Sequence, residues 1–312
     1  MIITGASKGF GRSISEQLAQ LSLSPTHFRL VGRDAVGLKA ARDTISRGRT
    51  VETTVIEEIE VDLSDIANLK GAADRMFAAP QSEHTYFKVC FLNNHGSLGP
   101  LAPIGCYEGD TLGEMSLAFN VNVASCCFLT SDLMQRCQAG GEYATLGIRK
   151  VLIVNVSSLA AIQPFGSWGI YCAGKAAREM FHRCLAEEVN KRGSDAFPII
   201  RILNYAPGPL DTNMQREIRE GVAVDKDTQK FYSELKEQGK LVSPDVSAST
   251  LIKLLLFEKF DNGAHIDFYD VSPTFWDSAP TTCCGCSNCM CGVDCQCKRA
   301  KKPLCPECSI PN

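Results

Sequence analysis

The sequence predicts an α/β fold, a doubly wound parallel sheet of the Rossmann type, in a single domain followed by a cysteine-rich C-terminal tail. Short apolar runs rich in β-branched residues recur along the chain, and segments of helical composition separate them. A glycine-rich turn directly follows the first run, which is typical of nucleotide-binding sheets. After Pro273 the alternation stops and cysteines dominate. We therefore expect a nucleotide-binding domain over residues 1–279 and a tail over residues 280–312.

The predicted strands share the length and β-branched content of buried parallel strands. They cover residues 1–4, 28–32, 57–63, 87–92, 150–156, 198–204 and 263–270. Helices are predicted to end near residue 21, to begin at Ser64, and to cover residues 35–47, 112–137, 168–192 and 244–257. Residues 140–147 are interpreted as a loop insertion, and the polar segment 214–241 has the composition of a mobile lid. Right-handed crossovers then place helices on both faces of the sheet.

The turn after the first strand predicts a dinucleotide-binding site. Glycines let the backbone approach a pyrophosphate, and the N-terminus of the following helix favours anions. The candidate cofactor-binding residues of this turn are Gly5, Ser7, Lys8, Gly9, Phe10 and Gly11.

Charges beyond the second strand indicate which nicotinamide cofactor is used. Arg33 stands where an arginine accommodates the 2′-phosphate of NADPH, whereas an acidic residue there would favour NADH. Lys8 and Arg12 add positive charge, so the sequence favours NADPH. Asp62, next to Leu63 at the end of the third strand, is a candidate acceptor for the adenine amino group. The alternative is that Arg33 is an ordinary surface charge.

Ser158, Tyr171 and Lys175 are the candidate catalytic residues. Ser158 follows the strand over residues 150–156, at the sheet edge where α/β proteins bind ligands. Tyr171 and Lys175 are four residues apart and therefore share one helical face. A tyrosine hydroxyl can protonate the oxygen of a carbonyl under reduction, and a nearby ammonium is expected to lower its pKa from about 10. Ser158 would hold the carbonyl oxygen by a hydrogen bond.

The spacing of Tyr171 and Lys175 alone is a weak signal. The bland alternative is a core tyrosine beside a surface lysine. A second pair with the same spacing, Tyr232 and Lys236, follows no strand and has Arg219, not a serine, 13 residues upstream. We interpret this second pair as an ordinary solvated pair on a helix.

Together these patterns resemble the short-chain dehydrogenase/reductase family over about residues 1–272. The motifs that carry the resemblance are Thr4-Gly5-x3-Gly9-x-Gly11, Asn93-Asn94-His95-Gly96, Ser158 with Tyr171-x3-Lys175, and Pro207-Gly208. The resemblance implies that Tyr171 donates the proton and that Ser158 orients the carbonyl. It implies that Lys175 lowers the pKa of the tyrosine and binds the nicotinamide ribose.

The resemblance also implies roles for residues outside the catalytic group. Asn122, an asparagine at a mid-helix position that disfavours it, matches one that supports a water relay to the lysine. His95 stands where an alanine is usual, and we expect it to line the cofactor site and narrow it. Further cofactor-binding residues implied by the resemblance are Asn93, Pro207, Gly208, Leu210 and Thr212.

Within the family, the chain is most similar to members that reduce pterins. The segments Tyr171-Cys-Ala-Gly-Lys-Ala-Ala-Arg178 and Gly263-Ala-His-Ile-Asp-Phe-Tyr-Asp270 carry this similarity. It implies an NADPH-dependent, homodimeric reductase of pterin side-chain carbonyls in tetrahydrobiopterin synthesis. It also implies a substrate site of Ser158, Tyr171 and Asp267, in which the Asp267 carboxylate bonds with the guanidine-like edge of the pterin.

Three alternatives to this interpretation remain open. Asp267 could be a strand-end carboxylate that faces water. The enzyme could act on other ketones or diketones. The chain could also be a metal-binding or redox-sensing protein built on a reductase scaffold.

The tail predicts a metal site. Nine of the 16 cysteines lie between Cys283 and Cys308, and two Cys-x2-Cys pairs have the spacing of a four-thiolate zinc site. The candidate ligands are Cys286, Cys289, Cys305 and Cys308. Because nine cysteines exceed one site, a metallothionein-like cluster of several soft ions is a second possibility. The third is a reduced tail that binds no metal.

Composition limits the range of partners. The net charge of −3 provides no basic field for nucleic acid or a membrane surface. The longest apolar runs are expected to be too short to cross a bilayer, and the N-terminus lacks the plan of a signal peptide. We expect a small-molecule substrate, a second copy of the chain as partner, and a cytoplasmic location.

Overall fold

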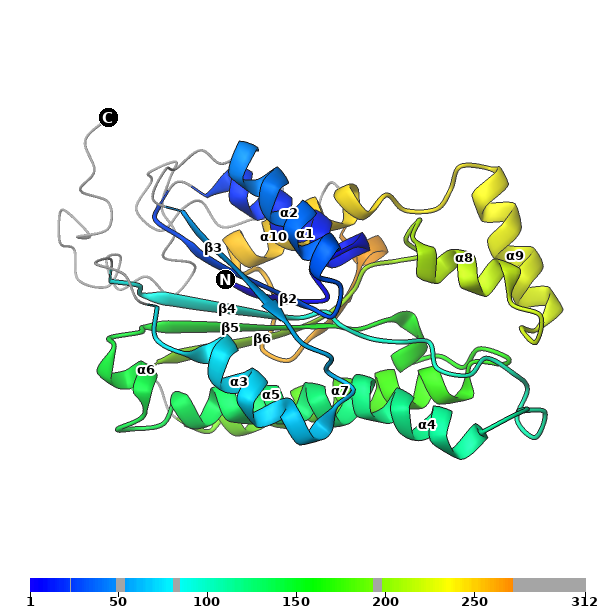
Figure 1. The fold of residues 1–312 in the computed structure, drawn as a ribbon, viewed down its shortest axis with the longest axis horizontal. Coiled ribbons are helices and arrows are strands. Elements are labelled where there is room, and N and C mark those ends of the chain that lie inside the picture. Colours follow the sequence, from blue (N-terminus) through cyan, green and yellow to red (C-terminus); the bar gives the residue numbers. More distant parts are fainter. Residues whose placement is uncertain (23, 49–53, 81–84, 193–197, 272–312) are drawn as a thin grey trace.

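The computed structural model describes residues 1–22, 24–48, 54–80, 85–192 and 198–271. Seven parallel strands form one sheet in the order β3-β2-β1-β4-β5-β6-β7 (Figure 1). The strand order reverses between β1 and β4, which is where doubly wound sheets open a crevice for a ligand. The predicted doubly wound parallel sheet is therefore confirmed.

The strands follow the predicted apolar runs closely. They are β1 (Ile2–Thr4), β2 (His27–Gly32), β3 (Val55–Glu60), β4 (Lys88–Asn93), β5 (Lys150–Val156), β6 (Ile199–Ala206) and β7 (His265–Asp267). β3 ends earlier than predicted, so Asp62 and Leu63 lie in the turn beyond it. β5 is buried along nearly its whole length, because helices cover both faces of the sheet.

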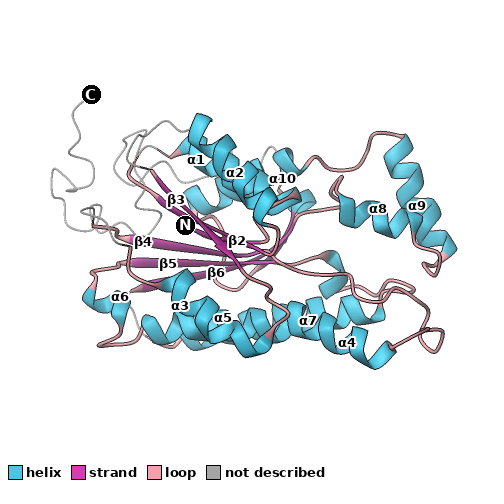
Figure 2. Ribbon diagram, viewed as in Figure 1, coloured by secondary structure: helices cyan, strands magenta, loops and turns pink. Residues whose placement is uncertain are grey.

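Two helical layers enclose the sheet (Figure 2). One layer consists of α1 (Gly9–Leu21), α2 (Ala35–Gly48) and α10 (Pro244–Phe257), and the other of α3 (Leu69–Phe77), α5 (Ser125–Arg136) and α7 (Gly169–Asn190). Each layer packs on its own apolar core, with Ile14, Leu38 and Leu251 in the first and Ala73, Leu129 and Ala186 in the second. The remaining helices are α4 (Thr111–Phe119), α6 (Glu142–Thr145), α8 (Asn213–Glu220) and α9 (Lys226–Glu237).

The predicted loop insertion at residues 140–147 contains a turn of helix, α6. Its glycines suggested a loop, but Tyr143 anchors the segment: its ring is buried, and its hydroxyl donates to the Phe77 carbonyl at 3.1 Å. The predicted lid segment forms α8 and α9, which project beyond the end of the sheet in Figure 1. Its mobility stays a prediction.

The helix predicted over residues 112–137 is continuous but not uniform. A π-helical turn, Asn120–Ala124, joins α4 to α5. The whole stretch Thr111–Arg136 is long and apolar enough to cross a membrane by length and composition, contrary to the sequence-based expectation that no run is. Its residues Cys126, Leu129 and Leu133 are fully buried in the fold, and 28% of its apolar window is buried.

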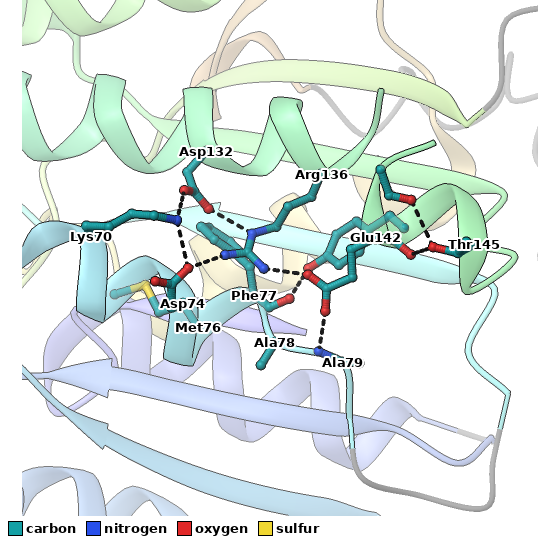
Figure 3. A network of polar contacts seen from close by, with 12 residues as sticks. Lys70, Asp74, Met76, Phe77, Ala78, Ala79, Asp132, Arg136, Glu142 and Thr145 are labelled. Atoms are coloured by element: carbon teal, nitrogen blue, oxygen red, sulfur yellow. Dashed lines mark hydrogen bonds and ion pairs between the residues drawn. The ribbon is translucent and has the colours of Figure 1, made fainter. Parts of the chain in front are cut away.

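A polar network ties α3, α5 and α6 together at the outer surface of the second layer (Figure 3). Arg136 is its centre, with contacts to Asp132 at 2.8 Å, Glu142 at 2.5 Å and Asp74 at 2.7 Å. Burial opposes the charge of Arg136, but its bonds to Asp132 and Glu142 outweigh burial and raise its pKa. Lys70 contacts the same Asp132 at 2.9 Å. The network therefore fixes the orientation of α5, which continues from the π-helical turn.

We expect Arg136→Met to lower the free energy of unfolding by about 2 kcal/mol, because the nearly buried Asp132 loses one of its two cations. Urea unfolding measures this value. Lys230→Met is the control: its pair with Glu234 spans 4.0 Å and both side chains are largely exposed. Equal effects of the two changes would contradict a structural role for the network.

Candidate active site

Ser158, Tyr171 and Lys175 converge beyond the end of β5. Ser158 follows this strand, and its side chain forms a hydrogen bond with the Tyr171 hydroxyl. Lys175 lies one turn after Tyr171 on α7, and its Nζ is 5.6 Å from the centre of the tyrosine ring. The same Nζ donates to the Val156 carbonyl at 2.8 Å, which holds α7 against the end of β5. Both Tyr171 and Lys175 are buried, so the lysine is not the surface residue of the bland alternative.

The electrostatics of this group differ from the sequence-based expectation. Burial raises the pKa of Tyr171 to about 12, although the bond with Ser158 and the charge of Arg178 act in the opposite direction. Burial, followed by the charge of Arg178, lowers the pKa of Lys175 well below its usual value. In the protein alone, then, the cation that favours ionised Tyr171 is Arg178, which sequence reasoning did not single out.

Asn122 lies in the π-helical turn, next to the loop after β4 and close to Lys175. Its side chain forms two hydrogen bonds with the backbone of Ser97, at 2.8 and 2.9 Å. A Cβ added at Gly96 would lie 3.1 Å from Asn122 Oδ1 and 3.9 Å from Lys175 Nζ. Since π-helical turns are frequent at functional sites, this local irregularity is consistent with the predicted role of Asn122 beside the lysine.

The glycine turn lies at the other side of the crevice. Gly5 and Gly9 have φ angles of 66° and 56°, which L side chains disfavour, so the turn requires glycine at both positions. No side chain caps α1 at Lys8, and its first backbone N–H groups are available to an anion. A Cβ at Gly9 would lie 3.6 Å from Thr212 Cγ2, so the loop after β6 faces the turn. The fold thus brings Thr212, one of the predicted cofactor-binding residues, next to the glycine turn.

Nine other predicted cofactor-binding residues fall into three groups by exposure. Lys8, Arg33 and Asp62 are exposed, and Pro207, Gly208 and Leu210 are half-buried in the loop after β6. The side chains of Phe10, Leu63 and Asn93 are buried in the fold, so only their backbone atoms can face a cofactor.

His95 occupies a different place from the one expected. Its ring is buried between Thr4, whose Oγ1 is 2.9 Å from Nδ1, and Ser125, whose Oγ is 2.8 Å from Nε2. Burial holds its pKa well below 6.5, so the ring is neutral. The histidine therefore links β1 to the first residue of α5, and its ring does not line or narrow the cofactor site.

Asp267 lies at the carboxyl end of β7, half-buried at the same edge of the sheet. Burial raises its pKa, and its Oδ1 accepts a hydrogen bond from the Tyr269 backbone at 2.9 Å. Glu179 of α7 contacts this strand: it accepts hydrogen bonds from His265 of β7, at 2.8 Å, and from Ser157. Burial alone would raise the pKa of Glu179, but these two bonds outweigh it and lower it. The Glu179 carboxylate therefore connects α7 to Ser157, which directly precedes Ser158, and to β7, which carries Asp267.

Tyr232 was misinterpreted as a solvated residue. Its ring stacks on Trp168, with centroids 5.7 Å apart and planes 12° apart, and Trp168 packs edge-on against Tyr171. Burial raises the pKa of Tyr232 to about 12, and the charges of Tyr171 and Tyr269 act in the same direction. Phe165 stacks on Trp168 at 5.0 Å. The rings of Phe165, Trp168 and Tyr232 form an aromatic wall next to the catalytic tyrosine.

The predicted metal ligands Cys286, Cys289, Cys305 and Cys308 lie outside the described residues, as does the tail 280–312. Within the described part of the chain, no cluster of three or more His, Cys, Asp or Glu side chains could hold a metal ion.

Comparisons with known proteins agree with this arrangement. The chain is 37% identical to sepiapterin reductase from Bos taurus over 275 residues, which cover 86% of this chain and 94% of the relative. It is 30% identical to a benzil reductase ((S)-benzoin forming) from Bacillus cereus, with 84% of this chain and 96% of the relative covered. The crystal structure of a short chain dehydrogenase/reductase from Saccharomyces cerevisiae matches with a TM-score of 0.68 and 25% identity, over 89% of this chain and 98% of that one.

The sequence pattern of the short chain dehydrogenases matches residues 1–223, which include the glycine turn, Ser158, Tyr171 and Lys175. With the parallel sheet and the convergent side chains, this match shows that the chain is an oxidoreductase of the short chain dehydrogenase family.

Proposed function

We propose that the protein is an NADPH-dependent reductase of pterin side-chain carbonyls, with sepiapterin and 6-pyruvoyl-tetrahydropterin as substrates, at the end of tetrahydrobiopterin synthesis. The observation that carries the proposal is Asp267, a half-buried carboxylate at the same sheet edge as the hydrogen-bonded Ser158 and Tyr171. The similarity to sepiapterin reductases over most of both chains supports it. We further propose that the protein is a cytoplasmic homodimer.

The residues present fit a nicotinamide cofactor. The uncapped N-terminus of α1 and the glycine turn suit the pyrophosphate, and the exposed Lys8 and Arg33 suit a 2′-phosphate. Arg12 contributes less than expected, because its guanidinium pairs with Glu16 at 2.7 Å. When bound, the cofactor supplies the hydride.

The chain's own residues manage the proton. Ser158 and Tyr171 hold the carbonyl oxygen, and Tyr171 gives its proton to that oxygen as negative charge develops there. With a pKa of about 12, Tyr171 keeps its proton at neutral pH, which is the form that reduction needs. Lys175 Nζ lies 5.6 Å from the centre of the Tyr171 ring, on the same helical face, and Asn122 holds the loop beside the lysine.

An assay with sepiapterin tests the proposal. The purified protein should reduce it with NADPH, and kcat/KM with NADH should be at least about tenfold lower, because NADH has no 2′-phosphate to interact with Arg33 and Lys8. Absence of sepiapterin turnover would refute the pterin assignment. Benzil serves as the comparison substrate in the same assay, since the chain is also similar to a benzil reductase.

Zinc binding by the tail stays a separate prediction from the sequence. Metal analysis of the purified protein tests it, and deletion of residues 280–312 tests whether the tail affects turnover. Unchanged sepiapterin turnover after deletion would show that the reductase does not need the tail.

The aromatic wall predicts a specificity residue. We expect Tyr232→Ala to raise the KM for sepiapterin about tenfold, because the flat pterin loses a packing surface, while the dissociation constant of NADPH stays unchanged. Phe87→Ala is the control, since Phe87 is exposed and precedes β4 at the opposite edge of the sheet from the crevice. An equal change in KM for both variants would show that Tyr232 does not contact the substrate.

A further inference from the structure

Arg178 is a buried guanidinium without a counter-charge. It lies on α7, three residues after Lys175, and it is 0% exposed. In the described part of the chain no carboxylate lies within ion-pair distance of it, and all its hydrogen-bond acceptors are neutral. Buried arginines are rare unless they are paired.

The guanidinium joins three elements of the site. Its Nε donates to Asn155 Oδ1 of β5 at 2.7 Å, its Nη1 to the His95 carbonyl at 2.8 Å, and its Nη2 to the Asn93 carbonyl at 2.6 Å. The last two acceptors belong to the end of β4 and the loop that follows it. Arg178 therefore ties the predicted cofactor loop to the helix that carries Tyr171 and Lys175.

Stability alone does not account for this residue. Removal of an unpaired cation from water costs several kcal/mol, and an apolar side chain of similar volume is often at least as stable in such a place. A charge retained at this cost is useful where negative charge develops during the reaction. Tyr171, two turns earlier on the same helix, acquires that charge when it loses its proton.

We propose that Arg178 is a positioning residue for the reaction: its fork holds the loop after β4 against α7, and its fixed charge stabilises Tyr171 after proton transfer. The inference rests on the function proposed above. It extends the catalytic group beyond Ser158, Tyr171, Lys175 and Asn122.

Several titratable groups surround Arg178. Those that face it are Tyr171, Lys175 and Glu179 of α7, His182 one turn later, His95 after β4, and Cys126 and Cys127 of α5. Burial lowers the pKa of His182 to about 4 and that of His95 well below 6.5, so both are neutral at pH 7. Burial raises the pKa of both thiols. Glu179 is engaged by Ser157 and His265.

The test compares R178M and R178K with R29M. Arg29 is the control for loss of a buried arginine: it is also buried and donates to the Met76 carbonyl at 2.9 Å, but unlike Arg178 it pairs with a carboxylate, Glu57, at 2.8 Å. For each variant, the dissociation constant of NADPH is measured by fluorescence titration, and kcat for sepiapterin is measured by steady-state turnover.

For R178M we expect kcat to fall about tenfold, since Tyr171 becomes a weaker acid. R178K keeps the charge, so its kcat should stay close to that of the wild-type protein, but NADPH should bind about fivefold more weakly, because one ammonium cannot span three acceptors. An R178M variant with the kcat of R29M would overturn the proposal.

Two further outcomes are also decisive. If R178M does not fold, the NADPH affinity of R178K tests the proposal, and an affinity equal to that of the wild-type protein would overturn it. If the wild-type protein reduces neither sepiapterin nor benzil, the proposed function fails while the inference is judged on NADPH binding alone. In that case R178M should bind NADPH about fivefold more weakly than the wild-type protein, and unchanged NADPH binding would reject the role of Arg178.

Discussion

Tyr171→Phe should lower kcat for sepiapterin about a thousandfold, while NADPH binding changes little. The change removes the hydroxyl that bonds with Ser158 and gives its proton to the substrate oxygen, but it leaves the buried ring in place. Steady-state turnover and NADPH fluorescence titration measure the two effects separately.

Tyr143→Phe controls for the loss of a buried hydroxyl. Tyr143 is buried in α6, and its hydroxyl donates to a backbone carbonyl. We expect this variant to be less stable but to keep its kcat. If Tyr171→Phe retained more than about a tenth of the turnover, protonation by the phenol would be the wrong mechanism.

Local patterns made the framework of the site predictable. The glycine turn, the strand end at Ser158 and the four-residue spacing of Tyr171 and Lys175 each depend on neighbours in the sequence. Parallel strands bring their carboxyl ends to one edge, so residues that follow β1, β5 and β6 meet in the crevice whatever fills the core. For this reason the loop after β6, which carries Thr212, faces the glycine turn.

Contacts between distant segments were not predictable in the same way. Tyr232 reaches the aromatic wall because α9 lies beside Trp168, more than 60 residues earlier in the chain, and no local pattern signals that contact. The one available signal was its aromatic neighbour Phe231 in an otherwise polar helix. The burial of His95 likewise depends on the distance between β1 and α5.

For the charged residues of the site, too, positions along the chain were predictable and the effects of packing were not. The sequence pairs Tyr171 with Lys175, and their proximity is confirmed. The balance of their pKa values, however, depends on how deeply both are buried, which only the packed structure reveals. Arg178 could have been flagged as a cation on the apolar side of a core helix, but its lack of an acidic partner is a property of the fold.

Asp267→Asn should raise the KM for sepiapterin about thirtyfold and leave kcat and NADPH binding nearly unchanged. The substitution removes the charge, whose hydrogen bonds to a guanidine-like group are worth about 2 kcal/mol. An asparagine oxygen can still accept the bond from the Tyr269 backbone, so the turn after β7 should persist. Asp270→Asn is the control, because Asp270 is exposed and accepts from the Asp267 backbone at 2.8 Å.

The same variant separates pterin recognition from general carbonyl reduction. Benzil has two ketones but no guanidine-like edge, so its KM should not depend on the charge of Asp267. Sepiapterin presents that edge, and a half-buried carboxylate has few water molecules to lose when the pterin arrives. A large change in KM for sepiapterin with none for benzil would place the pterin ring against Asp267. Equal changes for both substrates would instead indicate that Asp267 supports only the shape of the crevice, and the pterin assignment would lose its principal argument.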